Sequence, residues 1–99
     1  MVLLTNYLYL YDCTHARRSN ARRVAFTKEL YGYTYSWKTK SGVREKRKLG
    51  LLDECVGAEA VADSAVIVPD EYRSLFDHLF STYQDILHLR VYEIVREVY

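Results

Sequence analysis

The clearest pattern of hydrophobic and polar positions follows Pro69. Aromatic and aliphatic side chains recur every three or four positions there, at Tyr72, Leu75, Phe76, Leu79, Phe80 and Tyr83. This spacing predicts an amphipathic helix beginning near residue 70 with one core-facing stripe. Asp70 and Glu71 fall in its first turn, where acidic side chains favour the helix dipole. The apolar run 64–68, SAVIV, predicts a short buried strand that ends at the proline.

Two other segments alternate with a period of two and predict strands. Residues 2–12, VLLTNYLYLYD, place Leu8 and Leu10 on one face and Tyr7, Tyr9 and Tyr11 on the other. Both faces then need cover, which is typical of a central strand. We expect the tyrosines to pack under a helix, with burial against a second copy of the chain as the alternative. Residues 86–95 predict the last strand, and a helix continuing from residue 70 is the alternative there.

The segment 15–31 predicts a helix with a poorly defined apolar stripe. Asp12 or Thr14 would cap its start, and Gly32 would end it. One candidate stripe consists of Ala21, Val24 and Ala25, and the other of Phe26 and Leu30. The stretch 53–63, DECVGAEAVAD, predicts a loop with one helical turn.

Residues 31–52, YGYTYSWKTKSGVREKRKLGLL, predict a β-hairpin. A three-residue loop, 40–42, would give Gly42 the positive φ that glycine adopts easily. This register would put Tyr33, Tyr35 and Trp37 on one face with Val43, Leu49 and Leu51. The opposite face would carry Lys38, Lys40, Arg44, Lys46 and Lys48. A two-residue loop would instead place Tyr35 and Trp37 beside Lys46 and Lys48, because a slip of one residue reverses sides.

These elements, in the order β-α-β-β-β-α-β, predict an α+β fold in a single domain spanning residues 1–99. We expect a mostly antiparallel sheet with two helices packed on one face and a protruding basic β-hairpin. Residues 2–11 have half the length of a membrane span and no basic region precedes them, so a soluble intracellular protein is expected. Cys13 and Cys55 are too few for a disulfide framework; free thiols are expected, although a pair is possible in a hyperthermophile.

Charge adds a strong asymmetry to this outline. The net charge is +1, yet residues 13–50 hold eleven basic side chains against Glu29 and Glu45, and residues 51–99 hold three basic side chains against ten acidic ones. The 10 tyrosines also exceed ordinary usage and suit half-exposed surfaces. Basic residues gathered in one part of the chain indicate a nucleic acid, most simply DNA, as the partner.

The basic helix and hairpin supply the candidate binding residues. A two-stranded ribbon fits a major groove, its cations reach phosphates, and an aromatic side chain stacks on a base or supports the arm from below. The candidates are Arg17, Arg18, Arg22, Arg23, Trp37, Lys38, Lys40, Arg44, Lys46, Arg47 and Lys48. Two copies would pair two arms, so a homodimer is expected. The alternative is a solvated hairpin whose lysines only protect an edge from aggregation.

The run Asp12-Cys13-Thr14-His15 is a weaker candidate for chemistry. A carboxylate and an imidazole at a strand end would bind a divalent metal for phosphodiester cleavage if Asp53, Glu54 or Asp63 joined them. A helix cap with an exposed His15 is the simpler interpretation. His78 and His88 lack ligand spacing, and there is no phosphate loop, nucleophile elbow or Cys-x-x-Cys pair. We therefore expect a non-enzymatic protein without cofactor or metal.

Three stretches, YLYLYDC, HARRSNARRVAFTKELYGYTYSWKTKSGVREKRKLGLL and ADSAVIVPDEYRSLFDHLF, together resemble small uncharacterised proteins of lipothrixviruses and rudiviruses. These are filamentous and rod-shaped viruses of hyperthermophilic archaea. The resemblance implies a viral protein in the host cytoplasm and a family without an established activity, and it transfers no functional residues. Residues 7–37 also resemble the opening of Cas2-type ferredoxin-like proteins, with Asp12 at the end of the first strand before an Arg-rich helix. The basic hairpin and the strand–Pro69–helix unit depart from that pattern.

The sequence thus predicts a nucleic-acid-binding module that uses the hairpin and the first helix. A structural or protein-interaction component of a virus, in which opposite charges pair between copies, is the alternative. A metal-dependent nuclease ranks third.

Overall fold

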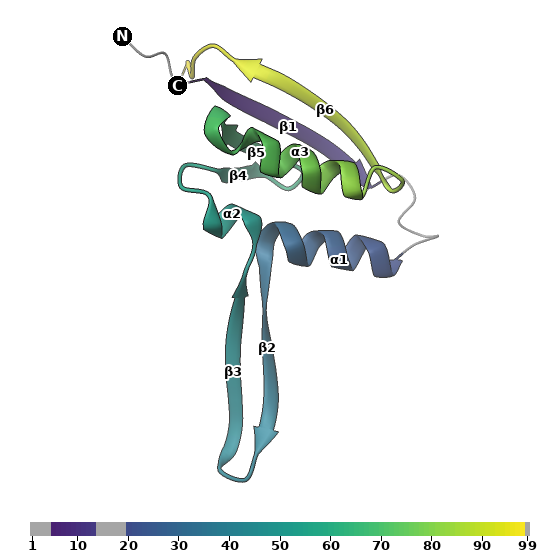
Figure 1. Cartoon of the computed structure of the whole chain (residues 1–99), viewed down its shortest axis with the longest axis vertical. Helices are drawn as coiled ribbons and strands as arrows, with labels where there is room; N and C mark the ends of the chain where they lie inside the picture. The colour runs from purple at the N-terminus through teal and green to yellow at the C-terminus, as the bar shows by residue number, and fades with distance from the viewer. Residues whose placement is uncertain (1–4, 14–19, 99) are drawn as a thin grey trace.

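The structure is a computed structural model that describes residues 5–13 and 20–98. It contains two sheets, of four strands in the order β4-β5-β1-β6 and of two strands, β2-β3. The elements are β1 (Asn6–Cys13), α1 (Asn20–Tyr31), β2 (Gly32–Thr39), β3 (Gly42–Leu49), α2 (Leu51–Glu54), β4 (Glu59–Ala62), β5 (Ala65–Pro69), the 3-10 turn η1 (Asp70–Tyr72), α3 (Arg73–Thr82) and β6 (Leu87–Ile94) (Figure 1). The predicted α+β class with an antiparallel sheet is confirmed.

Strand β1 is central in the larger sheet, as predicted, and pairs antiparallel with β5 and β6. Its Tyr9 and Tyr11 point to one face and are 0% and 8% exposed. Tyr9 stacks on Phe80 with the ring centroids 5.3 Å apart, and Tyr11 meets Phe26 edge-on at 5.5 Å. The tyrosines therefore pack under the helices, and Tyr9 and Tyr11 are not free to contact a second copy.

The hydroxyl groups of the buried tyrosines form hydrogen bonds at the edge of the core. The Tyr9 hydroxyl donates to Asp77 Oδ1 at 2.5 Å, and the hydroxyls of Tyr11 and Tyr31 lie 2.6 Å apart. Burial is the main cause that raises the pKa of both phenols well above the ordinary value. These rings supply apolar packing while their polar ends remain satisfied.

Both long helices cover the same face of the four-stranded sheet. Phe26 of α1 packs edge-on against Phe80 of α3, with the ring centroids 5.4 Å apart. Of the two candidate stripes in α1, the pair Phe26 and Leu30 is buried, whereas Val24 is 41% exposed. The α3 stripe is confirmed except at Leu75, which is 50% exposed.

The segment after the hairpin differs from the predictions in two ways. The helical turn begins at Leu51, so this residue does not belong to the hairpin, and the segment after it contains β4, which pairs with β5. All four β4 residues are exposed, so no buried alternation marked them as a strand. The strands at 64–68 and 86–95 are confirmed as β5 and β6. The predicted cap at Thr14 lies outside the described residues.

The hairpin β2–β3 projects from the body as an arm (Figure 1). The radius of gyration is 16.1 Å, whereas a compact chain of this length has about 13 Å, and the longest axis measures 57 Å. Every residue of β3 is exposed, and so are residues 34–38 of β2. A two-stranded ribbon is marginally stable by itself in water, so its attachment to the body matters.

Candidate nucleic-acid interface

The arm carries aromatic and basic side chains on the same face. Strands β2 and β3 pair with Tyr33 opposite Lys48, Tyr35 opposite Lys46 and Trp37 opposite Arg44. Residues that are directly opposite in a sheet share one side of it. We call this side, formed by Tyr33, Tyr35, Trp37, Arg44, Lys46 and Lys48, the aromatic–basic face.

This register corrects the predicted three-residue loop. Thr39 pairs with Gly42, so the loop is the two-residue alternative, Lys40-Ser41. The Thr39 hydroxyl donates to the Gly42 carbonyl at 2.9 Å and accepts the Ser41 N–H at 3.3 Å. The side chain of Thr39 thus closes the turn, and the positive φ of Gly42, +126°, falls inside the strand pair. Because the loop has two residues, the aromatic rings and the cations lie on the same face, and their predicted separation onto opposite faces is wrong.

The three aromatic rings form a row along β2. The ring centroids of Tyr33 and Tyr35 lie 6.0 Å apart, and those of Tyr35 and Trp37 lie 5.8 Å apart with planes 29° from parallel. Tyr35 and Trp37 are 41% and 43% exposed. Lys28 of α1 places its ammonium 4.7 Å from the Tyr33 ring centroid, so a cation covers the ring nearest the body.

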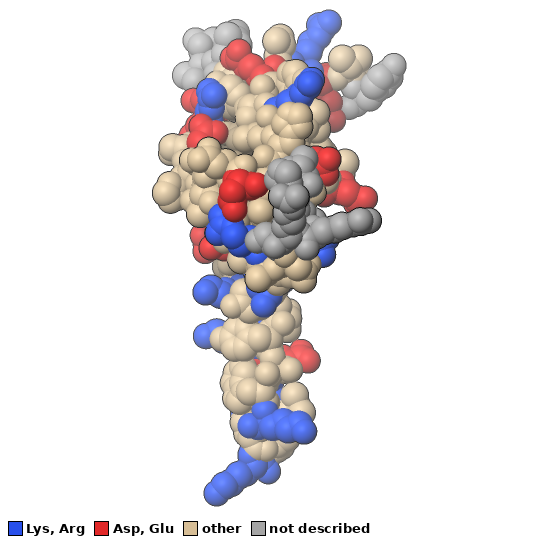
Figure 2. Space-filling view, turned by 90° about the vertical axis from the view of Figure 1, so that its right-hand side faces the viewer, with Lys and Arg blue, Asp and Glu red and all other residues tan. Residues whose placement is uncertain are grey.

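The arm is also a concentration of positive charge. It holds six basic side chains and one acidic one, a formal charge of +5. Within the part of the chain that the structure describes, no carboxylate lies within ion-pair distance of Arg44, Lys46 or Lys48. Figure 2 shows Lys and Arg side chains along the arm, and most of the visible acidic side chains lie on the body. These cations are thus available to an anionic partner.

The opposite face of the arm differs in character. It presents Lys38, Val43 and Glu45 near the tip and Arg47 near the base. Val43 is 65% exposed, and Glu45 offsets part of the positive charge. Lys40 sits in the loop at the tip. The two faces of one ribbon are therefore chemically distinct.

Arg47 fastens the arm to the body. Its Nη2 donates to the Tyr31 carbonyl at 2.8 Å and to Asp53 Oδ2 at 3.0 Å. Asp53 also accepts the Gly50 N–H at 2.9 Å, and this bond, with help from Arg47, lowers the pKa of the Asp53 carboxyl. Arg47 was predicted to contact nucleic acid, but the structure places its guanidinium at the base of the arm.

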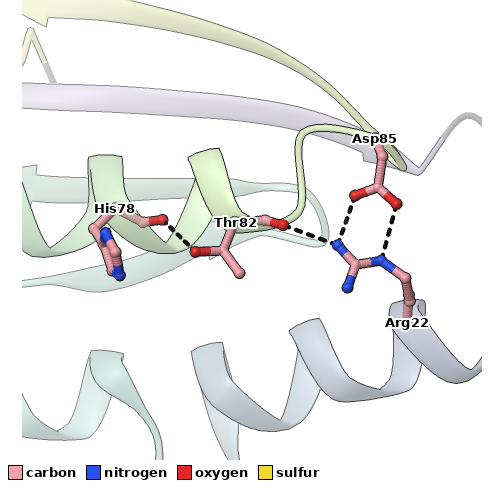
Figure 3. Close-up of polar contacts among 4 residues, drawn as sticks. All are labelled: Arg22, His78, Thr82 and Asp85. Carbon is pink, nitrogen blue, oxygen red and sulfur yellow. Dashed lines mark hydrogen bonds and ion pairs between the residues drawn. The ribbon is translucent and has the colours of Figure 1, made fainter.

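The arginines of α1 lie away from the arm. Arg22 donates to both carboxylate oxygens of Asp85, at 2.6 and 2.9 Å, and to the Thr82 carbonyl at 2.8 Å (Figure 3). It belongs to the first turn of α1, whereas the arm leaves from the last turn (Figure 1). Arg23 donates to Asn20 Oδ1 at 3.1 Å. Arg17 and Arg18 lie outside the described residues. The hairpin and the first helix are predicted to bind nucleic acid together, but Arg22 does not lie beside the hairpin cations.

A groove of about 620 Å³ lies where the aromatic–basic face meets the body. Tyr33 and Lys48 of the arm line it together with Lys28 of α1, and its apolar lining includes Leu51, Leu75 and Leu79. The half-exposed Leu75, which departs from the predicted stripe of α3, faces this groove. The groove therefore continues the aromatic–basic face toward α3.

The weaker chemical candidates remain separate. Asp12 lies opposite His88 in the sheet, His15 lies outside the described residues, and no three metal-ligating side chains gather among residues 5–13 and 20–98. Cys13 and Cys55 are free thiols. No described helix has both the length and the apolar character to cross a bilayer.

Comparisons with protein-family models, curated proteins and solved structures found no match to this chain.

Proposed function

We propose that the arm β2–β3 is a nucleic-acid-binding element and that the four-stranded sheet with its helices is the scaffold that presents it. One observation carries the proposal. Three aromatic rings and three cations without a carboxylate partner among the described residues share one side of a ribbon that is exposed along most of its length. Cations bind phosphates and exposed rings stack on bases, so this face offers both kinds of contact.

The simpler interpretation, a solvated hairpin that avoids aggregation, accounts for fewer features. Lysines on an exposed edge suffice for protection. They do not explain why Tyr35 and Trp37 remain more than 40% exposed on the most basic face of the arm. Large apolar rings are costly to expose to water, and their retention beside cations favours a partner with both charge and π-faces.

The test measures binding of labelled nucleic acids to the whole protein. Fluorescence anisotropy with duplex DNA, single-stranded DNA and RNA at a low and a high salt concentration should show binding that weakens with salt. The variant Lys46→Gln/Lys48→Gln removes two charges from the aromatic–basic face and should weaken binding about tenfold or more.

The matched control removes the same charge elsewhere. Arg90→Gln/Arg96→Gln lowers the net charge by two on the body, where both residues are exposed, and should leave the affinity within about twofold of the wild type. Equal losses in the two variants would mean that only net charge matters. Absence of binding to all three nucleic acids at low salt would overturn the proposal.

A second candidate function is supported by the separation of charge between arm and body. The arm carries +5, whereas the chain from residue 51 onward has ten acidic against three basic side chains. Such a molecule can pair the arm of one copy with the body of another, as a structural component or a homodimer would. In that case analytical ultracentrifugation shows association without nucleic acid, and added DNA leaves the assembly unchanged. A monomer that shifts only on addition of nucleic acid favours the binding arm.

A further inference from the structure

We infer that the aromatic–basic face binds single-stranded nucleic acid, with Tyr35 and Trp37 as the stacking residues; this inference rests on the function proposed above. The two rings are the outer members of the row along β2. Each has about two fifths of its surface exposed, and their planes lie within 29° of parallel. They can therefore offer π-faces to successive bases.

Tyr33 has a different role. It is only partly exposed, and the Lys28 ammonium already lies 4.7 Å from its ring centroid. Its ring is 6.0 Å from that of Tyr35. Tyr33 is thus a positioning residue that anchors the row to α1, and the ligand contacts the two rings farther out.

Each stacking ring has a cation directly across the ribbon. Lys46 lies opposite Tyr35 and Arg44 opposite Trp37. Opposite residues of an antiparallel pair have their Cβ atoms about 4.5–5.5 Å apart. A nucleotide carries a base and a phosphate, and this pairing of one ring with one cation, repeated twice along the arm, matches two consecutive nucleotides.

The spacing of the rings distinguishes single strands from duplexes. Bases stacked in a duplex repeat about every 3.4 Å along each strand, and their faces are covered by their neighbours. The ring centroids repeat at 5.8 to 6.0 Å, so they do not match stacked bases one to one. An extended single strand with unstacked bases can place one base on each ring. A duplex could use only the cations.

The experiment uses the single tryptophan of the chain as its reporter. An oligothymidylate of about twelve nucleotides, and a duplex of the same length, are titrated into the intact protein while Trp37 emission and ligand anisotropy are recorded. We expect the single strand to quench Trp37 and to bind at least tenfold more tightly than the duplex. Trp37→Ala and Tyr35→Ala should each weaken single-strand binding roughly five- to a hundredfold, and Trp37→Phe should retain most of it.

Val43→Ala is the matched control, because Val43 is an exposed apolar residue on the opposite face of the same arm. It should leave affinity and quenching unchanged. Circular dichroism of each variant checks that the arm remains folded. If Trp37→Ala loosens the arm, Trp37→Phe keeps the test valid, because it retains an aromatic ring at this position. Equal binding of duplex and single strand, with unquenched Trp37, would overturn the stacking inference while leaving a charge-based binding arm intact. Absence of binding to both would overturn both proposals.

Discussion

At the scale of single residues, long-range partners decide which cations are free. Arg22 and Asp85 are 63 positions apart in sequence, yet they form a bidentate ion pair (Figure 3). Arg22 also donates a hydrogen bond to the Thr82 carbonyl. No local pattern indicates this partner, because it depends on how α1 approaches the turn that follows α3. The basic character of Arg22 could be predicted from the sequence, but its structural role could not. The charge of Arg47 could likewise be predicted from the sequence, but its ion pair with Asp53 could not.

The Arg22–Asp85 pair predicts a pH-dependent stability. Hydrogen bonds from the guanidinium are the main cause that lowers the pKa of the Asp85 carboxyl in the folded protein. The contribution of Asp85 is therefore fully present above the ordinary value of about 3.9 and is lost as the pH falls through the lowered folded value. Asp85→Asn should unfold at a lower temperature than the wild type at neutral pH, and the gap should narrow and then close as the pH falls through the lowered pKa of the Asp85 carboxyl. Thermal unfolding followed by circular dichroism measures the gap.

The control for this prediction is Glu59→Gln, which removes an exposed carboxylate of β4 for which no ion pair is found in the described part of the chain. Its unfolding temperature should follow that of the wild type closely across the pH range. A gap between Asp85→Asn and the wild type that stays constant from neutral to acidic pH would contradict the assigned role of Asp85.

At the scale of elements, periodicity predicts those segments that bury one face. The stripe of α3, the alternation of β1 and the apolar run of β5 all reflect burial against one core, so their positions could be predicted. Strand β4 is an exposed edge and leaves no such trace. The register of the arm depends on a turn in which the Thr39 side chain takes part, and alternation within each strand cannot reveal which residues lie opposite.

The base of the arm predicts a second effect of mutation. Gly32 has a φ of +79°, and a Cβ there would lie 2.5 Å from the Lys48 carbonyl oxygen and 2.6 Å from the Gly50 nitrogen. Gly32→Ala combines backbone strain with a clash against main-chain atoms and should lower the free energy of unfolding by about 1–3 kcal/mol. Urea unfolding of the purified variant measures the change.

Gly42→Ala provides the comparison at the tip of the arm. Gly42 also has a positive φ, +126°, but an added Cβ would meet nothing within 4 Å. We expect a smaller loss of stability, because only backbone strain applies and the tip is remote from the core. Equal losses for Gly32→Ala and Gly42→Ala would show that close packing at the base contributes nothing.

At the scale of the whole molecule, the asymmetry of charge along the sequence becomes an asymmetry in space. The basic segment forms α1 and the arm, and the acidic remainder supplies α2, β4 to β6 and α3 of the body. The partition could be predicted by counting charges. The extent of the accessible positive surface could not be predicted in this way, because Arg22 and Arg47 bind carboxylates from the later half of the chain. The cations of the aromatic–basic face that have no carboxylate partner among the described residues are Arg44, Lys46 and Lys48.

This count predicts the salt dependence of binding. Each neutralised phosphate contributes about −0.7 to the slope of log K against log salt for a single strand, so three cations give a slope of about −2. Lys46→Gln alone should reduce its magnitude by about 0.7, whereas Arg90→Gln should leave it unchanged. Anisotropy titrations over a range of salt concentrations provide the slopes. A wild-type slope near zero, or the same change in both variants, would contradict the assignment.

The opposed pairing of β2 and β3 has a consequence for how the arm can diverge among related proteins. Inserting one residue between Thr34 and Tyr35 would turn Tyr35 and Trp37 away from Lys46 and Arg44, because side chains alternate along a strand. Inserting two residues into each strand would lengthen the reach and preserve the chemistry of both sides. Related arms should therefore vary in even steps, since an odd step in one strand divides the rings from the cations.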